Sequence, residues 1–137
     1  MFSSASKIVY RSGRTQSGAS YDDSTNTFRF NLESGNMTGI VVPCSPSTSY
    51  TFTASNRTGI QEGYSLNIQF YSGEPTYVQH DEEYLIKTET WSLPPSDNTA
   101  ERTNTLTTPG NCQYVGVSTY ANSSGEGSVV LTCVQNA

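Results

Sequence analysis

The chain carries many short runs in which apolar and polar residues alternate. Phe28 and Phe30 share one face of residues 27–31. The run 64–71 places its Leu, Ile and Phe residues on one face in the same way. Alternation with a period of two is typical of a β-strand with one buried face, and no apolar set recurs with helical spacing. The sequence therefore predicts an all-β protein.

About eight such runs follow one another, and segments rich in Gly, Pro, Asn, Asp and Ser separate them. The predicted strands are residues 27–31, 39–42, 49–54, 64–71, 83–91, 102–107, 113–120 and 128–134, and irregular segments are expected at 12–25 and 93–99. The last two strands are expected to form a closing hairpin. Strands of this number and spacing are typical of an antiparallel two-sheet sandwich or jelly roll.

The chain has 137 residues, which suits one domain of ordinary size. We expect residues 17–137 to form a single jelly-roll domain. Residues 1–16 precede it as an N-terminal arm or an edge strand. If they are an arm, a neighbouring subunit would be contacted by Phe2, Ile8, Val9, Tyr10, Arg11 and Arg14.

Composition and charge exclude several kinds of partner. Only 34% of the residues are hydrophobic, and the net charge is -5. Seven basic residues scattered along an acidic chain do not form the positive patch that nucleic acid requires. No apolar run approaches the roughly 18 residues of a membrane span, and no apolar signal segment opens the chain.

The three cysteines, Cys44, Cys112 and Cys133, form no closely spaced pair. A structural zinc site needs about four clustered ligands, so we expect none. We interpret the cysteines as buried thiols of a protein made in a reducing cytoplasm. If two of them pair, the predicted closing hairpin favours Cys112 with Cys133.

Catalytic chemistry has little support in the sequence. The single histidine, His80, stands in an acidic segment with no nucleophile motif beside it. We therefore expect a protein that is not an enzyme and has no cofactor. A calcium ion is the one alternative, because carboxylates in turns suit a hard cation. Its candidate ligands are Asp22, Asp23, Asp81 and Glu82.

Aromatic residues offer a second kind of site, because Trp and Tyr rings stack on sugars and nearby polar groups bind the hydroxyls. The alternative is that these rings pack in a core that has few aliphatic residues. The candidates for glycan contact are Trp91, Tyr71, Tyr77, Tyr84 and Tyr120.

Five segments stand in a recognisable order along the chain. They are a Gly/Ser-rich entry at 17–29, TGIVVP at 38–43, SPSTSYTF at 45–52, LNIQFY at 66–71 and LTTPGNCQYV at 106–115. With this order the chain resembles, over residues 17–134, the small carbohydrate-binding-like jelly-roll modules of bacteriophage tail, baseplate and other virion proteins. In that family the strand ending in Phe-Tyr is usually followed by Asp or Asn, whereas Ser72 follows it here.

The resemblance implies a non-enzymatic protein of a phage particle, made in the host bacterial cytoplasm. We expect a small decoration or cement-type protein on a capsid or tail lattice, with weak adhesion to host glycans as a side role. Its partners would be capsid or tail proteins and further copies of itself, for example in a trimer. The alternative is a receptor-binding or carbohydrate-binding module of a tail fibre or baseplate.

Overall fold

The computed structural model describes residues 1–11, 18–33, 35–59, 65–78, 83–91, 101–120 and 124–137. These residues form ten strands and no helix, which confirms the predicted all-β class. The strands are β1 (Lys7–Tyr10), β2 (Ser20–Asp22), β3 (Thr27–Leu32), β4 (Met37–Pro43), β5 (Ser49–Gly59), β6 (Ser65–Tyr71), β7 (Leu85–Trp91), β8 (Arg102–Thr107), β9 (Tyr114–Tyr120) and β10 (Gly125–Gln135).

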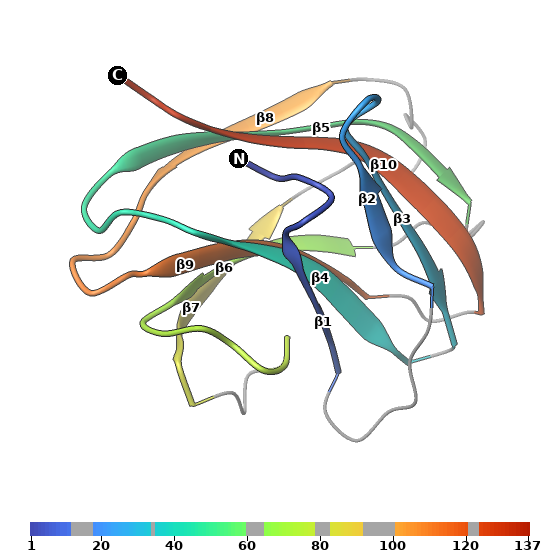
Figure 1. The fold of residues 1–137 in the computed structure, drawn as a ribbon, viewed down its shortest axis with the longest axis horizontal. Helices are drawn as coiled ribbons and strands as arrows, with labels where there is room; N and C mark the ends of the chain where they lie inside the picture. The colour runs from blue at the N-terminus through green and yellow to red at the C-terminus, as the bar shows by residue number, and fades with distance from the viewer. Residues whose placement is uncertain (12–17, 34, 60–64, 79–82, 92–100, 121–123) are drawn as a thin grey trace.

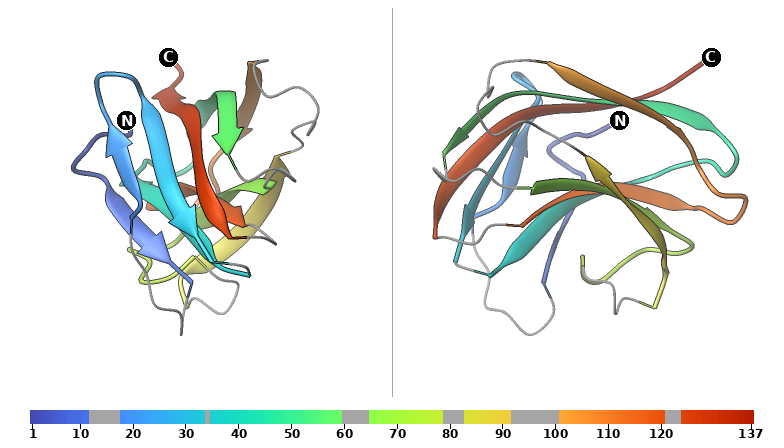
Figure 2. Two further views of the ribbon diagram at one scale, coloured as in Figure 1. Left: turned by 90° about the vertical axis from the view of Figure 1, so that its right-hand side faces the viewer. Right: turned by 180° about the vertical axis from the view of Figure 1, so that it is seen from behind.

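The strands form two five-stranded antiparallel sheets that pack face to face as a sandwich. Sheet A has the order β1-β4-β9-β6-β7, and sheet B has the order β2-β3-β10-β5-β8. The long strands β5 and β10 arch over sheet A (Figure 1). The two layers are also distinct from behind (Figure 2). The predicted two-sheet sandwich is therefore confirmed, with ten strands in place of about eight.

The core fills the space between the sheets with the alternate apolar residues of each strand. Phe28 and Leu131 of sheet B are fully buried there, as are Ile40 and Ile68 of sheet A. The Trp91 ring meets the Phe52 ring edge-on, with centroids 6.5 Å apart. A core with large rings from both sheets compensates for the low aliphatic content of the chain.

The predicted closing hairpin is wrong. β9 pairs with β4 and β6 in sheet A, whereas β10 pairs with β3 and β5 in sheet B. Both strands are central, so each already has a partner on either side. The chain crosses from one sheet to the other between them, and this removes the hairpin on which the suggested pairing of Cys112 with Cys133 rested.

The two additional strands lie in the N-terminal part of the chain. Residues 7–10 form β1, which pairs with β4 at the edge of sheet A. β2 lies within the segment 12–25, which we expected to be irregular, and pairs with β3. A strand of three residues with one apolar side chain, Tyr21, gives too short a pattern for alternation to reveal.

The outer face of sheet A is partly covered by the segment that follows β6. Val78 is fully buried and packs with Val9, Val41 and Tyr71 in a second, smaller core. The Gln69 side-chain amide donates a hydrogen bond to the Val78 carbonyl, at 3.1 Å. The segment therefore closes this face around Tyr71.

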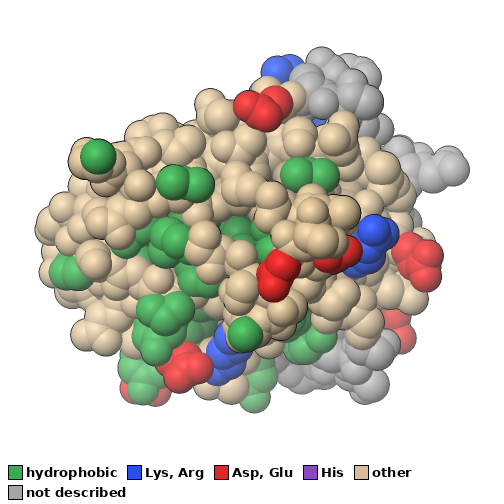
Figure 3. Space-filling model, turned by 45° about the horizontal axis from the view of Figure 1, so that its top comes forward, with side chains coloured by type: hydrophobic (Ala, Val, Ile, Leu, Met, Phe, Trp, Pro, Cys, Tyr) green, Lys and Arg blue, Asp and Glu red, His purple; other side chains and the backbone are tan. Residues whose placement is uncertain are grey.

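The outer face of sheet B is open, and small hydroxylated side chains occupy most of it. Neighbouring hydroxyls bond to each other across strands, as Thr51 and Thr105 do at 3.0 Å. Figure 3 views the top and front of the molecule, where backbone and uncharged polar side chains make up most of the surface and apolar and charged groups are scattered among them. We call the hydroxyl-bearing part of the outer face of sheet B the hydroxyl face. It consists of Ser49, Thr51, Thr53, Ser55, Thr103, Thr105, Thr107 and Thr132.

No helix in the described part of the chain is long and apolar enough to cross a membrane.

Candidate functional site

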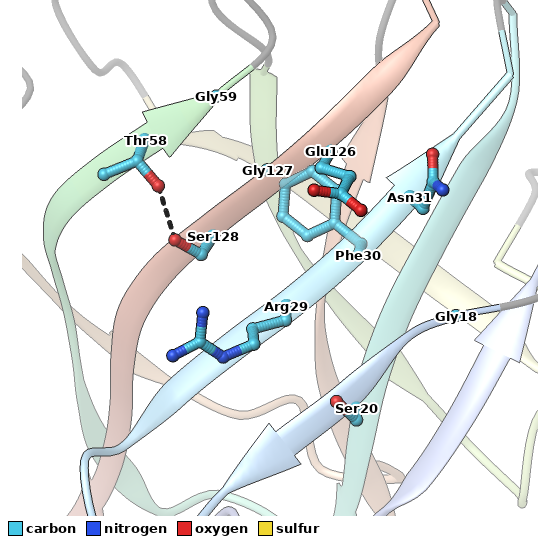
Figure 4. Close-up of a pocket in the computed structure, with 10 residues that line it drawn as sticks. All are labelled: Gly18, Ser20, Arg29, Phe30, Asn31, Thr58, Gly59, Glu126, Gly127 and Ser128. Carbon is cyan, nitrogen blue, oxygen red and sulfur yellow. Dashed lines mark hydrogen bonds between the residues drawn. The ribbon is translucent and has the colours of Figure 1, made fainter.

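A polar groove lies on the outer side of sheet B, where β5 ends and β10 begins. It has a volume of about 440 Å³, within the range of roughly 300–1,000 Å³ that small-ligand sites occupy. Its polar side chains come from four adjacent strands (Figure 4). They are Ser20 of β2, Arg29 and Asn31 of β3, Glu126 and Ser128 of β10, and Thr58 of β5.

Strand register brings these residues together. Arg29 lies opposite Ser128, which in turn lies opposite Thr58. Asn31 lies opposite Glu126 on the next outward row. Because alternate residues of a strand point to the same face, Phe28 and Phe30 enter the core while Arg29 and Asn31 point outward.

Two glycines allow the strands and the Phe30 ring to pack closely beneath the groove. A methyl group on Gly127 would lie 2.6 Å from the Phe30 ring, so any larger residue would displace a core aromatic. Gly59 has a positive φ of 81°, and its hydrogen faces the Glu126 carbonyl. Glycine accepts this conformation without strain. The floor is therefore backbone with the edge of the Phe30 ring beneath it.

Three polar side chains surround this floor. Arg29, Asn31 and Glu126 are exposed. No hydrogen bond or ion pair engages their side chains within the part of the chain that the structure describes. By contrast, Thr58 and Ser128 bond to each other, at 2.5 Å between their hydroxyl oxygens. The groove thus offers a cation, an amide and a carboxylate to a ligand.

Asp22, beside the groove, is engaged in its own turn. The Ser24 hydroxyl and backbone N–H both donate hydrogen bonds to its carboxylate, at 2.7 and 2.9 Å. These bonds lower the pKa of Asp22, and the Arg29 charge adds to the effect. Asp23 accepts hydrogen bonds from the Ser4 backbone and hydroxyl. These two of the four predicted calcium ligands therefore have structural partners.

The other metal and catalytic candidates lie mostly outside the described residues. Asp81, Glu82 and His80 are in this group. Among the residues that the structure does describe, no three His, Cys, Asp or Glu side chains gather closely enough to hold a metal ion.

The aromatic candidates for glycan contact are spread over the molecule, and none lies in the groove. Trp91 and Tyr71 are buried, because the two cores use their rings. The structure therefore corrects these two candidates to packing residues. Tyr77 and Tyr84 are exposed, at 41% and 37%, and Tyr120 is half-buried at the end of β9.

The assembly candidates at the N-terminus are mostly used within the chain. Phe2 and Val9 are buried, and Ile8 packs against the main core. Tyr10 is half-buried in β1, and Arg11 donates a hydrogen bond to the Gly35 carbonyl. The structure corrects this part of the set, because an arm folded into its own sheet is not available to a neighbour. Arg14 lies outside the described residues.

The cysteine arrangement also differs from the expected one. The Sγ atoms of Cys44 and Cys112 are 3.5 Å apart. Cys133 lies in sheet B, where its Sγ contacts the Met1 sulfur at 3.8 Å. The suggested pairing of Cys112 with Cys133 is therefore wrong, because it depended on the hairpin that the sheets exclude.

Sequence reasoning missed Arg29, Asn31 and Glu126 as site residues. The sequence could have revealed two of the three. The alternation that directs Phe28 and Phe30 into the core directs Arg29 and Asn31 outward. Nothing in the sequence showed that β10 would lie beside β3 with Glu126 opposite Asn31.

Comparison with known proteins supports the fold. No protein-family model and no curated protein sequence matches the chain. Among solved structures, a cleaved adhesin domain of Lys-gingipain from Porphyromonas gingivalis is similar with a TM-score of 0.63 at 10% identity. The match covers 99% of this chain and 92% of that domain.

Two further similar structures belong to a phage tailspike protein and to lectinolysin. The enzymatically active domain of a bacteriophage CBA120 tailspike protein is similar with a TM-score of 0.60 at 6% identity, covering 95% of this chain but only 19% of the tailspike chain. The lectin-binding domain of lectinolysin, complexed with Lewis b, has a TM-score of 0.52 at 8% identity, covering 97% of this chain and 94% of that domain. The similar structures are thus carbohydrate-binding-like and adhesin-like sandwiches, one of them from a phage tailspike.

Proposed function

We propose that this protein is a non-catalytic glycan-binding module and that the groove on sheet B holds the sugar. The observation that carries the proposal is a set of three exposed side chains, Arg29, Asn31 and Glu126, around a floor of glycine backbone. Within the described residues none of the three takes part in a hydrogen bond or ion pair. Sugar hydroxyls both donate and accept hydrogen bonds. A guanidinium that only donates, a carboxylate that only accepts and an amide that does both can match them.

The charges of the groove favour a neutral sugar. Arg29 and Glu126 carry opposite charges. A ligand with a net charge would therefore be attracted by one of these side chains and repelled by the other. Among the described residues that line the groove there is no exposed aromatic face for stacking, so hydrogen bonds carry the affinity. We expect a weak module that works through several copies.

The setting that we propose is the surface of a bacteriophage particle, as the order of the five segments implies. We place receptor binding ahead of lattice decoration, because Phe2, Ile8 and Val9 pack within the chain. Quantitative mass spectrometry of purified particles would test this. About a dozen copies would support a tail module, whereas hundreds of copies would favour decoration and absence would reject the virion setting.

The binding proposal is tested with a printed array of neutral and fucosylated oligosaccharides, followed by calorimetry on the strongest hit. We expect Arg29→Ala and Glu126→Gln each to weaken binding by about tenfold or more, because each removes a hydrogen bond from a charged group. The matched control is Glu101→Gln, an exposed carboxylate next to β8.

Equal binding by the two groove variants and the control would reject the groove as the site. Binding that instead fails on replacing Tyr77 or Tyr84 by Ala would place the sugar on the exposed tyrosines. No binding to any neutral glycan would reject the function itself.

A further inference from the structure

Cys44 and Cys112 lie on two loops that cross between the sheets at the same end of the sandwich. Cys44 follows β4 of sheet A, and the chain then enters β5 of sheet B. Cys112 lies between β8 of sheet B and β9 of sheet A. Figures 1 and 2 show the two loops side by side at one end of the molecule.

Hydrogen bonds hold these loops together independently of the thiols. The Cys44 backbone N–H donates to the Gln113 carbonyl at 2.9 Å. The buried Thr108 hydroxyl donates to the Ser45 carbonyl at 2.7 Å and accepts from the Thr48 N–H at 3.0 Å. The two sulfurs are therefore held near each other by a fixed backbone.

The two thiols differ in access. Cys112 is fully buried, whereas Cys44 is partly exposed. Their Sγ atoms are 3.5 Å apart, against about 2.05 Å in a disulfide. We expect rotation of the two side chains to close this gap while the backbone hydrogen bonds between the loops stay in place.

We propose that Cys44 and Cys112 are a modification site, a dithiol that a small-molecule disulfide such as oxidised glutathione converts to an intramolecular disulfide. The Cys44 thiolate attacks the oxidant, forms a mixed disulfide and releases one glutathione thiolate. The Cys112 thiolate then attacks Cys44 Sγ and releases the second. The two protein thiols are oxidised, the oxidant is reduced to two thiols, and the protein protons pass to the departing thiolates.

The bond would act at a distance from the glycan groove. Cys44 precedes β5, whereas the groove lies at the far end of this strand of 11 residues, which spans about 35 Å when extended. The disulfide would therefore stabilise the fold without changing the affinity of the groove for sugar. It closes a loop of 68 residues, long enough for a substantial restriction of the unfolded chain.

The test incubates the folded full chain with oxidised glutathione, followed by peptide mapping and thiol titration in denaturant. We expect the three free thiols to fall to one, with the Cys44 and Cys112 peptides linked. The melting temperature should rise by roughly 10 °C and return on reduction with dithiothreitol. Cys133→Ser is the matched control and should oxidise as the unsubstituted chain does.

Mapping on the unsubstituted chain keeps the test independent of how the variants fold. Cys44→Ser and Cys112→Ser should each lose the temperature shift. A stable glutathione adduct on Cys44, a bond to Cys133, or a link between two chains would each overturn the proposal.

Discussion

At the scale of single residues, Tyr21 joins the N-terminal segment to sheet B. Its ring packs against Phe2 with centroids 5.9 Å apart, and its phenol donates a hydrogen bond to the Leu131 carbonyl at 2.6 Å. Burial raises the pKa of Tyr21 to about 12, and the Asp23 carboxylate adds to this. The folded chain therefore favours a neutral phenol.

The raised pKa of Tyr21 predicts a loss of stability in strong base. Its unfolded value is 10.0, so the contribution is complete below pH 10 and is lost as the pH rises through about 12. The loss over this window should reach roughly 2 kcal/mol. Urea unfolding of the unsubstituted chain and of Tyr21→Phe across pH 9–12 measures the difference.

The exposed Tyr84 provides the control for this experiment. The free energy of unfolding of Tyr84→Phe should keep the full dependence on pH. That of Tyr21→Phe should fall less steeply as the pH rises. Identical slopes in all three proteins would show that Tyr21 ionises as readily in the folded state as in the unfolded chain.

At the scale of elements, β1 is part of the fold although it lies at an edge. It pairs with β4 along its full length, and Val9 enters the second core with Val41, Tyr71 and Val78. The segment after β6 also bonds to it, since the Val78 N–H donates to the Tyr10 carbonyl. β1 thus links sheet A to the segment that covers it.

This position predicts a stability cost for changes in β1. Val9→Ala removes two buried carbons and should destabilise the protein by about 2 kcal/mol. Lys7→Ala in the same strand removes only an exposed ion pair with Glu74 and should cost less than about 0.5 kcal/mol. Urea unfolding compares them, and equal small effects would indicate a detachable arm.

The position of strands was predictable, whereas their partners were not. Residues 102–107 were predicted as a strand and form β8, because alternation is a local property of the sequence. The separation of β9 from β10 depends on which sheet each strand joins. The candidate site could be predicted only in part for the same reason. Alternation showed that Arg29 and Asn31 point outward, but their position beside Glu126 depends on the register of β3 and β10.

At the scale of the whole molecule, most sheet neighbours are distant in sequence. Among the described strands, only the β2–β3 and β6–β7 pairs join consecutive strands. The central strands β9 and β10, near the C-terminus, each lie between two strands from much earlier in the chain. Each sheet therefore completes only when the C-terminal part has folded. The entropy of closing these long loops is lost before the contacts form.

This topology predicts slow folding, in the range of milliseconds to seconds that all-β sandwiches show. The single Trp91 is buried against Phe52, so its fluorescence reports closure of the core. Stopped-flow refolding from urea measures the rate. A microsecond relaxation would contradict the long-range order of the strands.

The hydroxyl face of sheet B has a consequence for how the protein meets its surroundings. Its water-binding groups are Ser and Thr hydroxyls, which neither titrate nor attract counterions at ordinary pH. Salt screens charges but leaves such hydration almost unchanged. Near the isoelectric point of about 4.6, electrostatic repulsion between molecules vanishes. The hydroxyl face is then hydrated to the same extent as at neutral pH. Acid therefore alters the charged rim of the groove while the sheet around it stays the same.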